Sequence, residues 1–96
     1  MTSKQRAFLR GISNKIDAIF QIGKNGINDN LIKQIDDALE ARELIKITVL
    51  ETAPDNANNL SFFISEKTNS SVIQVIGNKI TLFRQREKDS KIELPK

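Results

Sequence analysis

Cysteine, histidine, tryptophan and tyrosine are all absent from this chain of 96 residues. Without cysteine the protein forms no disulfide and offers no thiolate nucleophile. Histidine is the commonest general base and the commonest metal ligand, so its absence excludes a Ser-His-Asp triad and a zinc site of the Cys/His type. We therefore expect a protein that is not an enzyme and that holds no metal and no cofactor.

Long apolar stretches are also missing. No run approaches the roughly 18 residues that a membrane helix requires, and the polar residues 1–10 lack the apolar core of a signal peptide. On these grounds we expect a cytoplasmic protein. Hydrophobic residues make up 39% of the chain and charged residues 28%, a balance typical of one soluble domain with a modest core.

The excess of positive charge is small, at +3, but it is unevenly distributed. Residues 1–26 carry five basic groups and one acidic group, residues 27–70 carry four basic and eight acidic groups, and residues 71–96 carry six basic and three acidic groups. If the two ends of the chain meet in the fold, they form a basic face with an acidic back. Such a face is typical of a protein that binds a polyanion, with ordinary solvated charge as the alternative.

The beginning of the chain predicts a helix and a short strand. Thr2 and Gln5 have the spacing of a capping box, which marks a helix start. The apolar run 18–22 then predicts a strand. The stripe that the first helix should bury recurs at helical spacing and comprises Phe8, Leu9, Ile12 and Ile16.

A second helix and a second strand follow. Asn28 is a good N-cap, and the helix should end near Arg42. The β-branched run 44–50 alternates its apolar residues with the period of a strand. The buried stripe of the second helix should comprise Leu31, Ile32, Ile35 and Leu39.

The remaining elements are a third helix and a hairpin. Pro54 and Asp55 suit the start of a helix that reaches Glu66. Residues 72–76 and 79–84 predict two strands joined by a tight two-residue turn.

The predicted order is therefore α-β-α-β-α-β-β, an α/β domain with one mixed sheet and helices packed on it. Residues 1–86 should form the folded domain, and the polar residues 87–96 a mobile tail. The five phenylalanines are expected to lie in the core.

Gly23-Lys24-Asn25-Gly26 is the stretch that indicates chemistry, because it lies between a predicted strand and a capped helix. Its glycines allow a tight turn and close approach to another chain, and the helix start offers free N–H groups. The combination suits a phosphate, as in GXXG loops that hold a nucleic-acid backbone. It lacks the Gly-Lys-Ser/Thr of a Walker A loop and the third glycine of a dinucleotide fingerprint. A plain strand-to-helix turn is the alternative.

Four ordered segments resemble the CRM domain, the chloroplast RNA splicing and ribosome maturation module. They are the opening 2–10, the GXXG segment 19–27, the second helix and strand at 31–46, and the closing hairpin 74–84. The resemblance covers nearly the whole chain, and a free-standing domain of this size is similar to the bacterial YhbY group.

The resemblance implies a non-enzymatic RNA-binding protein that associates with precursors of the large ribosomal subunit. It also implies a four-stranded mixed sheet akin to that of the C-terminal domain of translation initiation factor three. By resemblance, the RNA-contacting loop is Gly23, Lys24, Asn25 and Gly26. The chain departs from the family pattern at Asn78, where many members carry a basic residue. We expect a monomer whose partner is ribosomal or precursor RNA, with no membrane and no small-molecule substrate.

Charge adds flanking candidates for phosphate contact on the first helix and on the hairpin. These candidates are Lys4, Arg6, Arg10, Lys79 and Arg84. For each of them a solvated surface position is the alternative.

Two other functions stay open. A protein-interaction adaptor would dock a basic partner, such as a ribosomal protein, on Asp36, Asp37 and Glu40 of the second helix. A small metal-dependent hydrolase would use the same three carboxylates. Positions 36 and 37 diverge by roughly 100° around a helix, which makes them a poor metal site.

Overall fold

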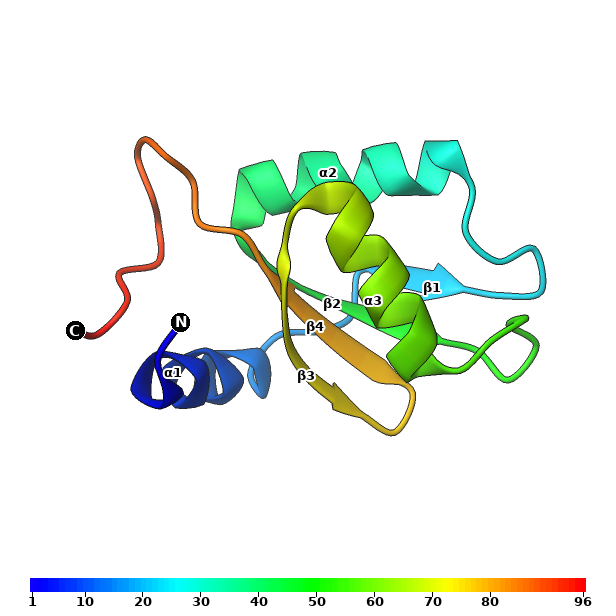
Figure 1. Cartoon of the computed structure of the whole chain (residues 1–96), viewed down its shortest axis with the longest axis horizontal. Helices are drawn as coiled ribbons and strands as arrows, with labels where there is room; N and C mark the ends of the chain where they lie inside the picture. Colours follow the sequence, from blue (N-terminus) through cyan, green and yellow to red (C-terminus); the bar gives the residue numbers. More distant parts are fainter.

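The computed structural model describes residues 1–96 and contains three helices and four strands in the predicted order (Figure 1). The elements are α1 (Ser3–Ser13), β1 (Phe20–Ile22), α2 (Asp29–Arg42), β2 (Leu44–Val49), α3 (Ala57–Thr68), β3 (Ser71–Ile76) and β4 (Lys79–Phe83). The capping box of α1 is confirmed, since the Thr2 hydroxyl accepts from the Gln5 N–H and the Gln5 side chain accepts from the Thr2 N–H, each at 3.1 Å. None of the helices combines the length and hydropathy needed to cross a bilayer.

The four strands form one mixed sheet, as predicted, and their order in it is β1-β2-β4-β3. β1 runs parallel to β2, and the other two pairings are antiparallel. The last residues of β1 and β2 lie at the same end of the sheet as the β3–β4 turn. Two hydrogen bonds show this: Leu50 N–H donates to Ile22 O at 2.9 Å, and Val49 N–H donates to Asn78 O at 2.7 Å. We call this the loop end of the sheet, since the GXXG segment leaves β1 there.

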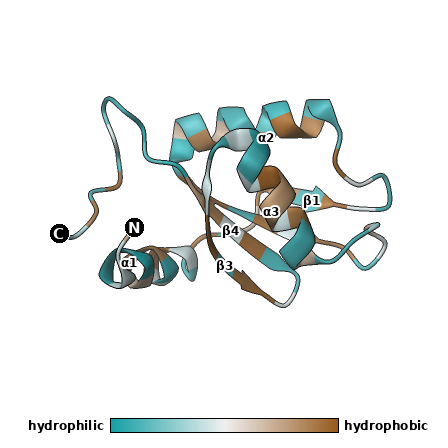
Figure 2. Cartoon of the chain, in the orientation of Figure 1, coloured by the Kyte–Doolittle hydropathy of each residue, from teal (hydrophilic) through white to brown (hydrophobic).

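α2 and α3 cover one face of the sheet and enclose the larger core. Eleven buried residues from α2, α3 and the strands β1, β2 and β4 form it, with Ile35 and Leu39 of α2 fully buried. The predicted phase of α2 is therefore confirmed. Figure 2 shows hydrophobic residues along β3 and β4, where α3 lies over them, and hydrophilic residues along much of α2.

α1 covers part of the opposite face, at the end of the sheet away from the loop end. Leu9 packs there against Leu44, Ile73 and Phe83 in a smaller core of four buried residues. At the end of α1, the Ser13 hydroxyl lies 2.7 Å from the Thr81 hydroxyl in a buried hydrogen bond. α1 ends at this point, so the face beyond it carries no helix.

The prediction that all five phenylalanines lie in the core is wrong. Phe83 is buried, but Phe8 is 40% exposed, Phe62 is 65% exposed and Phe63 is 46% exposed. On α3 the inward positions include Ser61, whose hydroxyl donates to a backbone carbonyl of its own helix at 2.7 Å. Helical phase therefore turns both α3 phenylalanines outward.

The start of α3 also differs from the prediction. The helix begins at Ala57, two residues later than the Pro54-Asp55 pair suggested, and Asn56 is its N-cap. The Asn56 side chain accepts from the Asn59 N–H at 2.8 Å. Asparagines that lower helix propensity thus supply the cap that starts this helix.

The segment after β4 folds back onto the domain. The buried carboxylate of Glu43, just after α2, accepts from the N–H groups of Arg86, Lys91 and Ile92 and from the Ser90 hydroxyl. Ile92 and Leu94 then pack against the smaller core. The tail, which the sequence predicted to be mobile, lies along the domain, where Ser90, Lys91 and Ile92 bind a residue 47 to 49 positions earlier in the chain.

Candidate nucleic-acid interface

The GXXG segment forms a tight turn with its two central side chains exposed. Gly26 N–H donates to Gly23 O at 2.9 Å, which closes the turn and places Lys24 and Asn25 at its tip. The N–H groups of Lys24 and Asn25 make no hydrogen bond within the chain. Two free amides beside an ammonium group form an arrangement suited to a phosphate.

The two glycines of the turn have different structural roles. Gly26 has a φ of +66°, and a Cβ at this position would lie 3.0 Å from Pro54 Cγ, so both backbone conformation and packing require glycine. A Cβ on Gly23 would lie 3.6 Å from Leu50 and 3.7 Å from Thr52, which is ordinary contact. The fold therefore does not require glycine at position 23.

The N-terminus of α2 contributes less to this site than its sequence suggests. The helix begins at Asp29, so two residues separate it from Gly26. The Asn28 side chain already accepts from the Leu31 N–H at 2.8 Å, and Asp29 places a negative charge in the first turn. The free amides and the lysine of this site therefore belong to the turn itself and not to the helix start.

An uncovered half of the sheet adjoins the turn at the loop end. Ile45, Ile47 and Val49 of β2 face the larger core, so the alternate residues of β2 face the other side. We call this half the open face. Thr48 and Thr81 at its centre are buried, and the exposed or partly exposed residues around them are Gln21, Lys46, Gln74, Ile76 and Lys79. Two lysines project on it.

Lys79 and Lys46 give the open face its positive charge. The Lys79 ammonium donates to the Thr48 hydroxyl at 2.7 Å, which keeps two of its three donors available. Lys46 forms no ion pair and is partly exposed. Sequence reasoning missed Lys46. Its position between two core isoleucines placed it on the opposite face of the strand, but the sequence did not show that this face is open.

The cations of α1 lie on the same side of the sheet as the open face but at the far end of the molecule. Lys4 and Arg10 are exposed and unpaired, whereas Arg6 donates to Val72 O at 2.8 Å and ties α1 to β3. Figure 1 shows α1 and the GXXG turn at opposite ends of the long axis, which measures 40 Å. An RNA that contacts both must extend along the whole protein.

Arg84, the second candidate on the hairpin, lies far from Lys79 and is hydrogen-bonded within the protein. It follows β4 at the end opposite Lys79, roughly 17 Å along the strand at 3.4 Å per residue. Its guanidinium donates to the Asp36 carboxylate at 2.6 Å, to Asp36 O at 3.0 Å and to Thr68 O at 2.7 Å. Its side chain is 21% exposed. These contacts explain Arg84 as a clamp between β4 and the two covering helices.

The same contacts change the account of the acidic second helix. Asp36 and Glu40 lie 2.6 Å and 3.6 Å from Arg84, and Asp37 lies 4.0 Å from Lys33. The three carboxylates proposed for an adaptor are thus each matched by a cation of the chain itself. The side of the sheet covered by α2 and α3 remains less basic than the side that carries α1 and the open face.

Comparisons with known proteins point to one family. The model of the CRS1 / YhbY (CRM) domain matches residues 1–84. The Bacillus subtilis (strain 168) protein named "Probable RNA-binding protein YqeI" is 44% identical over 95 residues, with 99% of each chain covered. A Haemophilus influenzae "RNA-binding protein" is 29% identical and covers 100% of this chain and 96% of its own length. The solution structure of SAV1595 from Staphylococcus aureus, a candidate RNA-binding protein by name, has a TM-score of 0.82 at 50% identity, with 99% of each chain covered.

Proposed function

Because the chain belongs to the CRS1 / YhbY (CRM) domain family, we propose that it is a non-enzymatic RNA-binding protein. The observation that carries this proposal is the exposed Lys24-Asn25 tip, whose two free amides and one ammonium group lie at the same end of the sheet as Lys79 of the open face. The relatives named as RNA-binding proteins support RNA as the polyanion.

The proposed mode of binding relies on phosphates more than on bases. Lysine side chains and free backbone amides recognise phosphate oxygens without reading sequence. The exposed phenylalanines of α3 lie on the side of the sheet covered by α2 and α3, opposite the open face, so they offer no stacking platform there. A structured RNA of extended shape fits this distribution of charge better than a flexible single strand.

We further propose that the RNA belongs to a precursor of the large ribosomal subunit. The resemblance of the chain to the YhbY group supports this source. Crosslinking in cells, followed by sequencing of the bound RNA, identifies the partner directly. Enrichment of large-subunit precursor sequences is the expected result, and enrichment of unrelated transcripts alone would reject this source while leaving RNA binding intact.

A salt series tests the electrostatic part of the proposal. If about four to six cations meet phosphates, log K falls with log salt at a slope of about −3 to −5 for a duplex-like RNA. Fluorescence anisotropy with a labelled RNA hairpin measures this slope. A slope near zero would remove the basis for the proposed interface.

A further inference from the structure

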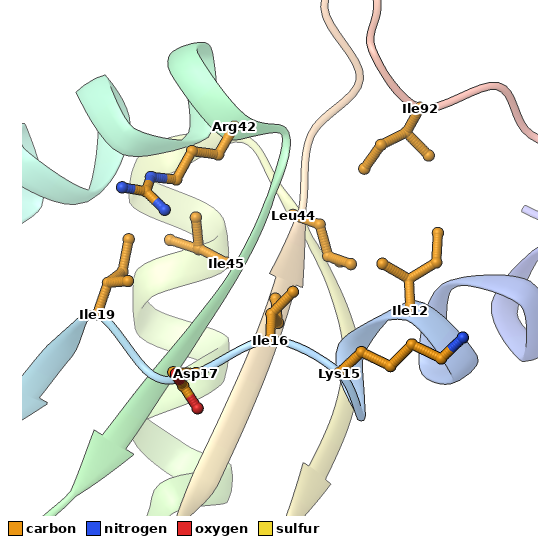
Figure 3. A pocket seen from close by; sticks show the side chains of 9 residues that line it. All are labelled: Ile12, Lys15, Ile16, Asp17, Ile19, Arg42, Leu44, Ile45 and Ile92. Atoms are coloured by element: carbon orange, nitrogen blue, oxygen red, sulfur yellow. The ribbon is translucent and has the colours of Figure 1, made fainter.

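A pocket of about 520 Å³ opens between the end of α1, the start of β2 and the tail (Figure 3). Its walls are six aliphatic side chains: Ile12, Ile16, Ile19, Leu44, Ile45 and Ile92. Three polar residues complete the lining, namely Lys15, Asp17 and Arg42. In Figure 3, Arg42 and Lys15 lie on opposite sides of the aliphatic group.

The pocket exists because β1 is short. Its first residue, Phe20, pairs with Ile47, so the first half of β2 has no strand beside it on that edge. The connection from α1 crosses this gap in irregular conformation and joins β2 through the Ile19 N–H, which donates to Lys46 O at 2.9 Å. Side chains from the connection therefore line a hollow where a longer strand would have filled the space.

The tail supplies the last wall. Ile92 N–H donates to the Glu43 carboxylate at 3.0 Å, which fixes Ile92 over the smaller core. Glu43 adopts a φ of +67° and a ψ of −44°, a conformation that favours glycine, and its side chain is fully buried. A strained glutamate at this position is explained by its hold on the tail, and the tail in turn bounds the pocket.

We propose that this pocket receives the base of one unpaired nucleotide of the bound RNA, such as a bulge. This inference rests on the proposed RNA-binding function. An aliphatic pocket desolvates the faces of a base, and its volume lies within the range of about 300–1,000 Å³ typical of small-molecule sites. Lys15 and Arg42 against Asp17 leave a net positive charge at the mouth, where the flanking phosphates of the nucleotide would lie.

The charge and the shape favour a nucleotide over a protein segment. An amphipathic peptide needs a long apolar groove for several anchors, whereas this hollow is bounded by Ile92 on one side and by the 14–19 connection on another. The pocket also includes Lys15, which continues the line of cations from α1. Lys15 therefore connects the pocket to the α1 cations that the proposed RNA contacts.

The test uses two RNA hairpins that differ only in one base. One carries a single bulged adenosine, and the other carries an abasic nucleotide at the same position. The two hairpins therefore have the same number of phosphates at the same positions. Anisotropy at fixed salt should show the adenosine hairpin bound about fivefold more tightly by the parent protein. Ile19→Trp, at a side chain that is 38% exposed, should fill the pocket and reduce this ratio to one without changing the affinity for the abasic hairpin. Phe62→Trp, on the opposite side, is the matched control and should keep the ratio.

Methyl NMR of the isoleucines gives a second readout that needs no variant. Adenosine-hairpin binding should shift the methyl signals of Ile12, Ile16 and Ile92, the abasic hairpin should not, and Ile64 under α3 should stay unchanged. If both hairpins bind the parent equally with a steep salt dependence, the pocket proposal fails and RNA binding stands. If the ratio persists in Ile19→Trp, the base lies elsewhere and the pocket proposal also fails. If neither hairpin binds, the proposed function and this inference fail together.

Discussion

Replacement of Glu43 tests how the tail is held. Each carboxylate oxygen accepts two hydrogen bonds, Oε2 from Arg86 N–H and the Ser90 hydroxyl, and Oε1 from the N–H groups of Lys91 and Ile92. Hydrogen bonds to a charged group contribute more than neutral ones, but donors near the surface regain water when the tail is released. We expect Glu43→Ala to lower the free energy of unfolding by about 2–3 kcal/mol.

Backbone strain at position 43 should determine how the Glu43 variants rank in stability. Glu43→Gly loses the same four hydrogen bonds but relieves the positive φ of +67°, so it should be about 1 kcal/mol more stable than Glu43→Ala. Glu43→Gln turns an amide N–H₂ toward two donors and should be as destabilised as Glu43→Ala. Urea denaturation ranks the three proteins, and hydrogen exchange at Lys91 and Ile92 reports release of the tail.

The difference in stability between the parent and Glu43→Gln should depend on pH with a definite sign. Burial alone would raise the pKa of Glu43, but the hydrogen bonds from Arg86, Ser90, Lys91 and Ile92 outweigh it and hold the pKa below its ordinary value of 4.5. A folded-state pKa below the unfolded one gives stability that is present above the ordinary value and is lost as the pH falls through the folded value. The advantage of the parent over Glu43→Gln should therefore shrink as the pH falls from 6 to below 4. An advantage that grows on acidification, or a Glu43→Ala protein as stable as the parent with Lys91 still protected, would refute the reasoning.

Three further predictions concern the core, the clamp and the turn. Leu39→Ala removes a fully buried side chain and should lower the free energy of unfolding by roughly 2–4 kcal/mol in chemical denaturation, and a loss below about half a kcal/mol would contradict the assigned packing. Arg84→Met breaks three hydrogen bonds and should cost about 1–2 kcal/mol of stability while leaving RNA affinity unchanged; a stable variant with weakened binding would show that Arg84 contacts RNA instead. Gly26→Ala should destabilise by about 1–2 kcal/mol, and Gly23→Ala should stay within about half a kcal/mol of the parent. Thermal denaturation compares the two variants, and a larger loss for Gly23→Ala than for Gly26→Ala would contradict the described turn geometry.

The elements that local chemistry defines were predictable from the sequence. The Thr2-Gln5 capping box, the Asn28 cap and the end of α2 at Arg42 all lie where the sequence indicated them. The β3–β4 turn at Gly77 is confirmed as well, with a φ of +57°. Each of these signals depends on residues a few positions apart, so a pattern in the chain determines them directly.

The parts that could not be predicted depend on contacts between distant segments. The Glu43 carboxylate binds residues 43 to 49 positions later, and Arg84 binds Asp36 across 48 positions. Charge alone cannot distinguish an arginine that contacts RNA from one that holds two helices to a strand. Likewise, the open face and Lys46 follow from where α1 ends on the sheet, a tertiary fact that periodicity does not contain.

The most direct test of RNA binding through the turn is the double variant Lys24→Asp, Asn25→Asp. Both side chains are exposed at the tip, so the melting temperature should stay that of the parent. Loss of an attractive charge and gain of two repulsive ones beside a phosphate should cost about 2 kcal/mol, or roughly thirtyfold in affinity for an RNA hairpin. Asp37→Lys with Glu66→Lys, two exposed positions on α2 and α3 that do not contact Arg84, is the control with the opposite charge change, and it should leave affinity equal or higher. A double variant that melts like the parent and binds RNA like the parent would contradict the assignment of the turn as the RNA-binding site.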